Sequence, residues 1–253
     1  MPFTFAHPAI VIPLSQSRLR LSLTALVAGS MVPDFEYFFR MKAVKNIGHH
    51  GLGLFVFDFP VAIVLTFIFH RWVRNPLIEH LPVNYRLRFD QYLGFDWNLY
   101  VANHLGRVAI SLFIGILSHF AWDAFTHHDG FFVLLVPALS HQIVLGPEVI
   151  PVYLLLQIVS SLWGLWMIYR MIAVSPRRPG ASYQSSQHFT YWSAWLMVAS
   201  IILTARLVWQ PEYRTFWDVF FSVLGSLTYA LIFNSVLYTE VKQFKWKVQS
   251  LWQ

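Results

Sequence analysis

Apolar residues occur in long blocks along the chain, separated by short polar stretches. Each block approaches the ~20 residues that an α-helix needs to cross the hydrocarbon core of a bilayer. The pattern predicts six transmembrane helices, at residues 20–39, 52–70, 106–127, 149–170, 190–209 and 216–239. The apolar segment 131–145 is too short to cross and contains Pro137, which favours a re-entrant or interfacial piece. We therefore predict an all-α fold, a polytopic transmembrane helix bundle.

The N-terminal residues form a separate, shorter apolar segment. As a helix, residues 3–14 would extend only about 18 Å, and Pro8 and Pro13 do not suit a regular crossing helix. We predict a short membrane-inserted segment that turns back and brings His7 towards the level of Asp34. A basic n-region and a small-residue cleavage site are missing here, so no cleavable signal peptide is expected.

Composition supports a membrane protein. Hydrophobic residues make up 57% of the chain and charged residues 12%, against roughly 25% charged in an average soluble domain. The net charge of +6 would suit a nucleic-acid partner, but the basic residues sit at the ends of the predicted helices, so no such partner is expected. The chain has no cysteine, which excludes disulfides, thiolate metal sites and a cysteine nucleophile.

The distribution of basic residues predicts the topology. By the positive-inside rule, the side richer in Lys and Arg is cytoplasmic. One side of the predicted helices carries thirteen of these residues, including the C-terminal tail, and the other carries four. The loop 128–148 has none. We predict a multi-pass protein of the inner, or plasma, membrane with a cytoplasmic C-terminus.

The chain is expected to form one domain with an internal linker. The loop 173–189 is rich in Ser, Pro, Gly and Gln, which is typical of a flexible connection. It would join a membrane-embedded core, residues 1–172, to a C-terminal transmembrane hairpin and basic tail, residues 190–253.

The strongest chemical signal lies at the end of the predicted helix 106–127. His119, Asp123 and His127 are spaced i, i+4 and i+8, which places them on one helix face. Ionisable groups are costly at membrane depth and mark functional sites by default. Two imidazoles and a carboxylate suit a divalent metal. The alternative is a helix-packing hydrogen-bond network without a metal. His128 and Asp129, beyond the helix, are expected to face solvent.

Two further carboxylates belong to the same, extracytoplasmic half of the predicted bundle. Asp34 follows Pro33 at the end of the first span and is a candidate metal ligand or general base. The alternative is a helix-end acid at the interface. Asp58 lies about two turns into the second span and is a candidate general base. It could instead be a structural acceptor beside the kink at Pro60.

Polar groups from other segments complete the predicted site. At most one of His49 and His50 is expected to be a metal ligand, and the alternative is that both are interfacial loop residues. Gln157 and Ser161 are candidates for substrate binding, with helix packing as the alternative. Arg206 is a candidate for binding an anionic substrate group such as phosphate, and the alternative is a side chain that snorkels to the interface.

Several of these segments resemble an uncharacterised domain-of-unknown-function family of bacterial polytopic membrane proteins. The matching blocks cover roughly residues 1–170 and lie at 1–9, 26–37, 49–60, 118–127 and 157–164. The blocks are specific together, although no single one is.

That family is similar in motif pattern to membrane-bound metal-dependent hydrolases, which show an early His, a Pro-Asp motif, a His-Arg-Gly block and a Ser-His-x-x-x-Asp helix. The matching residues here are Pro33-Asp34 and Ser118-His119 with Asp123. In place of the His-Arg-Gly block stands His49-His50-Gly51, without the downstream Thr-His-Ser, so the resemblance does not identify ligands for a second metal. It implies that His7, as the early His, joins the metal ligands.

The leading hypothesis is a membrane-embedded metal-dependent hydrolase. The metal would be held by His119, Asp123 and one or more of His7, Asp34, His49 and His127. Zinc suits this donor set, with manganese or iron as alternatives. A site in the outer half of the bilayer predicts a lipid or lipid-linked substrate, such as a phosphoester. The alternatives are a transporter or ion-handling protein and a non-catalytic membrane protein whose polar cluster is structural.

Overall fold

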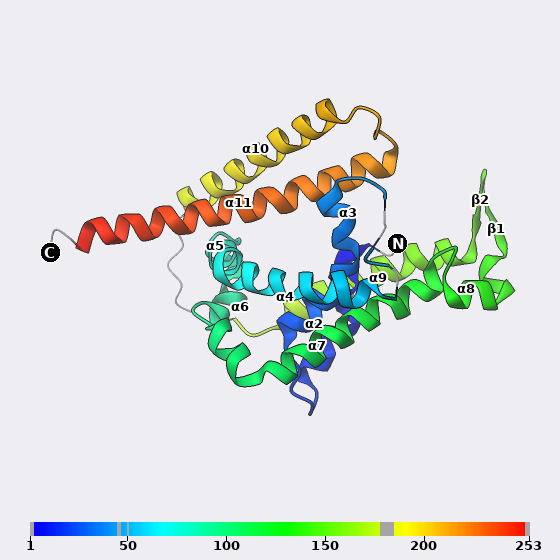
Figure 1. Cartoon of the computed structure of the whole chain (residues 1–253), viewed down its shortest axis with the longest axis horizontal. Coiled ribbons are helices and arrows are strands. Elements are labelled where there is room, and N and C mark those ends of the chain that lie inside the picture. Colours follow the sequence, from blue (N-terminus) through cyan, green and yellow to red (C-terminus); the bar gives the residue numbers. More distant parts are fainter. Residues whose placement is uncertain (1–2, 45–46, 50, 178–184, 251–253) are drawn as a thin grey trace. The chain divides into compact units, whose positions relative to one another are not determined.

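The computed structural model describes residues 3–44, 47–49, 51–177 and 185–250. Nearly all regular structure in these residues is helical, which confirms the predicted all-α class (Figure 1). Within them, the helices long and apolar enough to cross a membrane are Leu54–Glu79, Trp97–Leu135, Val152–Val174, His188–Trp209 and Phe216–Phe244. These coincide with five of the six predicted spans, and the chain is a multi-pass membrane protein.

The predicted span 20–39 is helical but interrupted. It begins as α2 (Leu23–Met31), where the Ser22 hydroxyl accepts a hydrogen bond from the Ala25 amide. A 3₁₀ turn, η3 (Val32–Asp34), then precedes α3 (Phe35–Arg40). Pro33 explains the interruption because it has no N–H for an α-helical hydrogen bond and its ring crowds the preceding turn.

The segment 131–151 contains strands that the sequence pattern did not predict. A short helix α8 (Phe131–Leu135) and the turn η7 (Pro137–Ser140) lead into an antiparallel hairpin of β1 (Gln142–Leu145) and β2 (Glu148–Pro151). Gly146 opens the two-residue loop with φ of 63°, a value that favours glycine and suits a type II′ hairpin.

The chain divides into two compact units. The first unit comprises Met1–Asp34, Asn46–Thr66 and Tyr100–Val174, and the second comprises Phe35–Lys45, Phe67–Leu99 and Ser175–Gln253. Every residue of the predicted site except Arg206 falls in the first unit.

In the first unit, the N-terminal segment, α2, α7 and α9 surround the polar residues. Besides the elements already given, its helices are η1 (Thr4–Ala6), α1 (Pro8–Val11), η2 (Ile12–Gln16), the π-helix η4 (Leu54–Asp58), α4 (Phe59–Ile68), α7 (Trp97–Thr126) and α9 (Val152–Val174). Two of these cross a unit boundary: α4 ends and α7 begins in the second unit.

Glycines bring α2 and α7 into backbone contact. A Cβ on Gly115 would lie 2.5 Å from the Leu26 carbonyl oxygen and 2.8 Å from the Ser30 amide nitrogen. Gly29 on α2 faces the same crossing, with its Cα 2.9 Å from the same position. Close approach through small residues is the usual way in which membrane helices pack. The crossing therefore lies one helical turn before His119 on α7, next to the predicted ligands.

The N-terminal segment packs against α9. Ser161 accepts a hydrogen bond from the Phe3 amide at 2.9 Å, and Gly164 leaves room for Ala6, whose carbonyl oxygen would be 3.0 Å from a Cβ at that position. The Trp122 indole donates to Ser160 at 3.0 Å and joins α7 to the same face of α9. These contacts fix the segment that carries His7.

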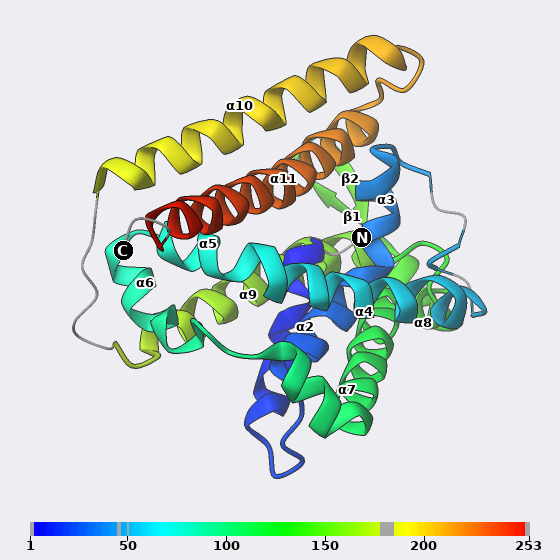
Figure 2. The ribbon, with the colours of Figure 1, turned by 60° about the vertical axis from the view of Figure 1, so that its left-hand side comes forward.

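The second unit is built on a helical hairpin. In both views α10 (Ser185–Trp209) lies along α11 (Phe216–Ser250) (Figures 1 and 2). The Tyr191 and Ser235 hydroxyls share a 2.8 Å hydrogen bond between the two helices. The unit's remaining helices are α3 and, in chain order, η5 (Phe69–Val73), α5 (Arg74–Glu79), α6 (Val83–Phe89) and η6 (Asp90–Tyr92).

Candidate metal centre

Helix α7 presents His119 and Asp123 on one buried face, as their spacing predicts. The His119 side chain is fully buried and Asp123 is 7% exposed. His119 Nε2 lies 3.3 Å from Asp123 Oδ2. The helix ends at Thr126, so His127 is the first residue beyond it. Its Nδ1 lies 3.6 Å from Asp123 Oδ1.

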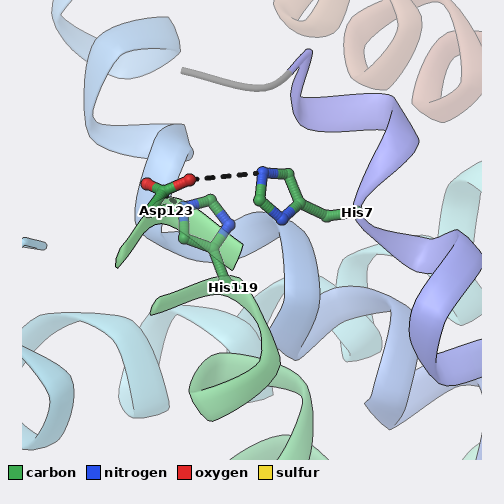
Figure 3. A group of neighbouring side chains, drawn as sticks. All are labelled: His7, His119 and Asp123. Carbon is green, nitrogen blue, oxygen red and sulfur yellow. Dashed lines mark ion pairs between the residues drawn. The ribbon is translucent and has the colours of Figure 1, made fainter. Parts of the chain in front are cut away.

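The N-terminal segment places His7 next to His119 and Asp123, in agreement with the predicted turn. The rings of His7 and His119 stack with centroids 4.0 Å apart. His7 Nε2 lies 3.8 Å from Asp123 Oδ1, the contact that Figure 3 marks with a dashed line. Figure 3 also shows the three side chains pointing towards one another, His7 from the N-terminal segment and the other two from α7.

Asp34 and His49 close the cluster from two further segments. Asp34 is fully buried, and its Oδ1 lies 3.5 Å from His119 Nε2. His49 Nε2 lies 3.5 Å from Asp34 Oδ1 and 3.7 Å from Asp123 Oδ2. His49 therefore stands between two carboxylates. His50, the alternative ligand at this position, lies outside the described residues.

We call these six residues the His/Asp cluster: His7, Asp34, His49, His119, Asp123 and His127. Two sets within it have ligand atoms that all lie within 4.8 Å of one another, one of His7, His119 and Asp123 and the other of Asp34, His49 and His119. The structure thus brings together five of the six residues that the sequence suggested as metal ligands. The sixth, His127, lies beside Asp123, but its Nδ1 donates to the Asp123 carbonyl oxygen at 3.2 Å.

Hydrogen bonds with groups outside the cluster determine which ligand atoms face its centre. His119 Nδ1 lies 2.9 Å from the Ser30 carbonyl oxygen, which can only accept, so Nδ1 donates and the neutral ring presents its lone pair at Nε2. Thr4 donates to Asp34 Oδ2 at 2.6 Å and leaves Oδ1 towards the histidines. Outer partners of this kind orient metal ligands.

The inward atoms fit a metal better than a direct network. Among the described residues, His119 Nε2, Asp34 Oδ1 and both Asp123 oxygens are buried and make no hydrogen bond. The nitrogen–oxygen separations of 3.3–3.8 Å exceed the ~2.7–2.9 Å of a charge-assisted hydrogen bond. Two ligands at about 2.0 Å from a tetrahedral ion are separated by roughly 3.3 Å. Buried imidazoles and carboxylates so spaced can hold a divalent ion.

The carboxylates of Asp34 and Asp123 shift the pKa of His49. Burial favours the neutral imidazole, but the nearby carboxylates of Asp123 and Asp34 together stabilise the charged form more strongly and raise the pKa of His49. The two buried carboxylates therefore favour the protonated form of this ring.

Asp58 lies beside the loop that carries His49. It ends the π-helix η4 and is fully buried. Its Oδ1 would be 3.1 Å from a Cβ at Gly48, and the Pro33 carbonyl oxygen would be equally close. Gly48 and Pro33 precede His49 and Asp34, so Asp58 stands next to the backbone that positions these two residues. Its role as general base stays a prediction.

The residues suggested for substrate binding lie in packing contacts. Ser161 donates to the Gln157 carbonyl oxygen at 2.7 Å and accepts from Phe3. Arg206 belongs to the second unit, where it is buried and donates to the carbonyl oxygens of Met41 and Gln210. A substrate role for these three residues, Gln157, Ser161 and Arg206, stays a prediction.

Sequence reasoning missed the supporting groups. Thr4 had a weak signal, as a polar residue in an apolar N-terminal block beside His7. The Ser30 contact is made by a main-chain carbonyl, which any residue provides, so no side chain could have identified it. Gly115 had the signal of a small residue one turn before His119 on a membrane helix.

The fold and the site define a class: a multi-pass helical membrane protein with a buried His/Asp cluster that can hold a metal ion. The chain belongs to the family defined by a domain of unknown function, DUF4184, whose model matches residues 1–240. This confirms the predicted membership of an uncharacterised family and extends the match over the last two spans. No curated protein and no solved structure matches the chain.

Proposed function

We propose that this protein is a membrane-embedded metal-dependent hydrolase that acts on a lipid or lipid-linked substrate, such as a phosphoester. The observation that carries the proposal is the convergence of three imidazoles and two carboxylates, His7, His49, His119, Asp34 and Asp123, in the buried part of one unit. A protein that needed only helix packing would gain little from so many buried ionisable groups, because each costs several kcal/mol to bury without a partner.

The donor set favours zinc, with manganese and iron as alternatives. Nitrogen and carboxylate donors suit all three ions, and zinc prefers a four-coordinate shell, which three side chains from the set of His119, His49, Asp34 and Asp123 would provide together with a water. A divalent ion bound there would lower the pKa of a bound water and polarise the scissile bond.

The protein's side chains would provide metal ligation, proton transfer and substrate binding. Asp34 and Asp123 face imidazole nitrogens and therefore serve as ligands. Asp58 is then the carboxylate left to accept a proton from the attacking water. Gln157 and Ser161 remain the proposed substrate contacts within the first unit. Asp58→Asn should keep the metal and lose hydrolysis, whereas Asp58 as a purely structural acceptor predicts reduced stability instead.

The proposed location of the reaction follows from the topology. The surplus of basic residues on one side supports a cytoplasmic C-terminus, and with that orientation the end of α7 and the cluster would lie in the opposite half of the membrane. A C-terminal reporter that functions only outside the cytoplasm should stay inactive in a bacterial inner membrane. An active reporter would contradict this orientation.

The decisive experiment measures metal content. The full chain, purified in detergent and stripped with a chelator, is incubated with Zn²⁺, freed of excess ion and analysed by mass spectrometry. We expect bound zinc in the wild type and its loss in His119→Gln and Asp123→Asn. The same preparations are then tested for hydrolysis of p-nitrophenyl phosphate and of phosphatidic acid in mixed micelles.

The chain offers matched controls next to the cluster. His128 and Asp129 have side chains that are 77% and 52% exposed, so His128→Gln and Asp129→Asn make the same chemical changes outside the cluster. Both should keep the wild-type metal content. A folded wild type that retains no ion from Zn²⁺, Mn²⁺ or Fe²⁺ would remove the basis of the proposal.

A further inference from the structure

The segment that joins α7 to α9 exposes large apolar side chains. On α8, Phe131 is 66% exposed and Leu134 is 72% exposed. On the hairpin, Val144 is 71% exposed and Val149 is 56% exposed. The stretch from residue 130 to residue 147 contains no Asp, Glu, Lys or Arg. Contiguous apolar surface of this kind marks a site of contact with another protein or with lipid.

Both faces of the hairpin are apolar. Val144 pairs with Val149 across the two strands, and Ile143 pairs with Ile150. Neighbouring pairs point to opposite faces of a sheet, so the valine pair covers one face and the isoleucine pair covers the other. Figure 1 shows the strands as a narrow ribbon that projects away from α8. A two-stranded hairpin is only marginally stable in water, and transfer of its apolar faces out of water is favourable.

The backbone of the hairpin limits how deep in the membrane it can lie. The sheet has two strands, so each strand has an outer edge whose N–H and C=O groups pair with no further strand of this sheet. Such edges are unstable in the hydrocarbon core, where each unsatisfied backbone group costs several kcal/mol. The apolar faces thus favour lipid, and the edges favour water or lipid head groups. Both are accommodated at the boundary between the head groups and the acyl chains.

Contacts with α7 and α9 hold the segment near the ends of these helices. Both belong to helices that are long and apolar enough to cross a membrane, so the segment between them lies at one membrane surface. Phe132 stacks on Phe125 of α7 with ring centroids 4.1 Å apart. The Val152 amide of α9 donates to the His141 carbonyl oxygen at 3.0 Å. These contacts keep the apolar side chains close to the level at which α7 ends and α9 begins.

We infer that residues 131–151 form a lipid-binding element in the interfacial layer of the leaflet at this end of α7 and α9, with Phe131, Leu134, Val144 and Val149 inserted among the acyl chains. The partner is a phospholipid leaflet and not a second copy of the chain. Strand pairing between two copies would use an edge of the hairpin and leave both apolar faces in water. Because this segment has no Lys or Arg, its attraction to the membrane is apolar and needs no anionic lipid. The inference goes beyond the proposed function and does not depend on a bound metal.

The test places a fluorescent label on the segment. The chain has no cysteine, so Val144→Cys and Leu134→Cys each take a single NBD label, and the full-length protein is reconstituted into phosphatidylcholine nanodiscs. Both side chains are exposed, so the label should leave the fold intact. Quenching by a lipid with a spin label near its head group should exceed quenching by aqueous iodide several-fold. Glu212→Cys, in the exposed loop between α10 and α11, should show the reverse. Leu162→Cys, 64% exposed in the middle of α9, should be quenched most by a lipid labelled midway along its acyl chain.

Three results would overturn the inference. Iodide quenching of Val144→Cys as strong as that of Glu212→Cys would place the hairpin in water. A label shielded from both iodide and spin-labelled lipid would mean that protein, such as a second copy of the chain, covers the segment. A several-fold rise in lipid quenching when phosphatidylglycerol is added would show that charge, and not apolar contact, drives the binding. Each result leaves the proposed function to be judged separately by metal content.

Discussion

At the scale of single residues, hydrogen bonds from outside the cluster determine which ligand atoms are available. The Ser30 carbonyl oxygen fixes the tautomer of His119, and Thr4 occupies Asp34 Oδ2. Both contacts hold buried groups whose alternative orientations would direct the wrong atom inward. Removing such an outer partner typically lowers metal affinity 10–100-fold.

Thr4→Val should therefore lower metal affinity by about 10–100-fold. The substitution keeps the shape of the side chain but leaves Asp34 Oδ2 buried without its donor. Zinc affinity is measured by competition with a chromophoric chelator. Thr66→Val is the matched control, because Thr66 is equally buried but donates only to Ile63 of its own helix. Equal affinities in the two variants would contradict the role of Thr4.

Metal affinity should also rise with pH beyond the ordinary titration range of histidine. Imidazole ligands must be deprotonated, and Asp34 and Asp123 raise the pKa of His49 above the ordinary value of 6.5 for a histidine. A raised pKa means that the proton competes with the metal up to a higher pH, so affinity should still increase between pH 6.5 and 8. Chelator competition at both values measures the change. A flat profile over this interval would show that His49 carries no proton there.

At the scale of elements, the sequence predicts what local periodicity determines. The i, i+4 spacing of His119 and Asp123 needs only a helix, and α7 supplies it. The two prolines of the N-terminal segment indicated a short piece that turns back, and in the structure Thr4 contacts Asp34 and His7 contacts Asp123. The hairpin of β1 and β2 was not predicted, because its residues read as one apolar run whose pairing depends on a two-residue turn.

The glycine contact of α2 with α7 is an element-level feature with consequences for the cluster. A methyl group on Gly115 would meet the Leu26 carbonyl oxygen and the Ser30 amide, so the two helices would have to separate. Their separation would lengthen the hydrogen bond from His119 to the Ser30 carbonyl oxygen. Packing and ligand orientation are therefore coupled at this crossing.

Gly115→Ala should accordingly destabilise the protein by about 1–3 kcal/mol, the usual range for overpacking, and weaken metal binding as well. Gly106→Ala on the same helix is the control. A Cβ at position 106 meets nothing within 4 Å, so this change should be neutral or slightly stabilising. Thermal unfolding followed by tryptophan fluorescence measures the stability. If Gly106→Ala were the more damaging variant, the close crossing would not govern stability.

At the scale of the whole molecule, the cluster joins segments that are far apart in the chain. Its ligands come from the N-terminal segment, the end of η3, the loop at His49 and the end of α7. All lie in the first unit. The sequence predicted that these segments share one half of the bundle, but it did not predict the contacts that bring their ligand atoms together. Those contacts depend on the break at Pro33 and on helix packing that periodicity does not encode. A metal bound there would act as a cross-link within that unit.

Metal removal should therefore loosen the first unit selectively. A ligand that binds only the folded form stabilises it by RT ln(1 + [L]/Kd), about 4 kcal/mol at 1,000 times Kd. Chelation should thus increase hydrogen exchange in the N-terminal segment, α2 and the end of α7. The helices α10 and α11 of the second unit serve as the internal reference, because their contacts, such as that of Tyr191 with Ser235, involve none of the ligands. Hydrogen exchange followed by mass spectrometry, with and without chelator, compares the two units in one sample. A uniform increase over both units would mean that the cluster's stabilising effect is not confined to the first.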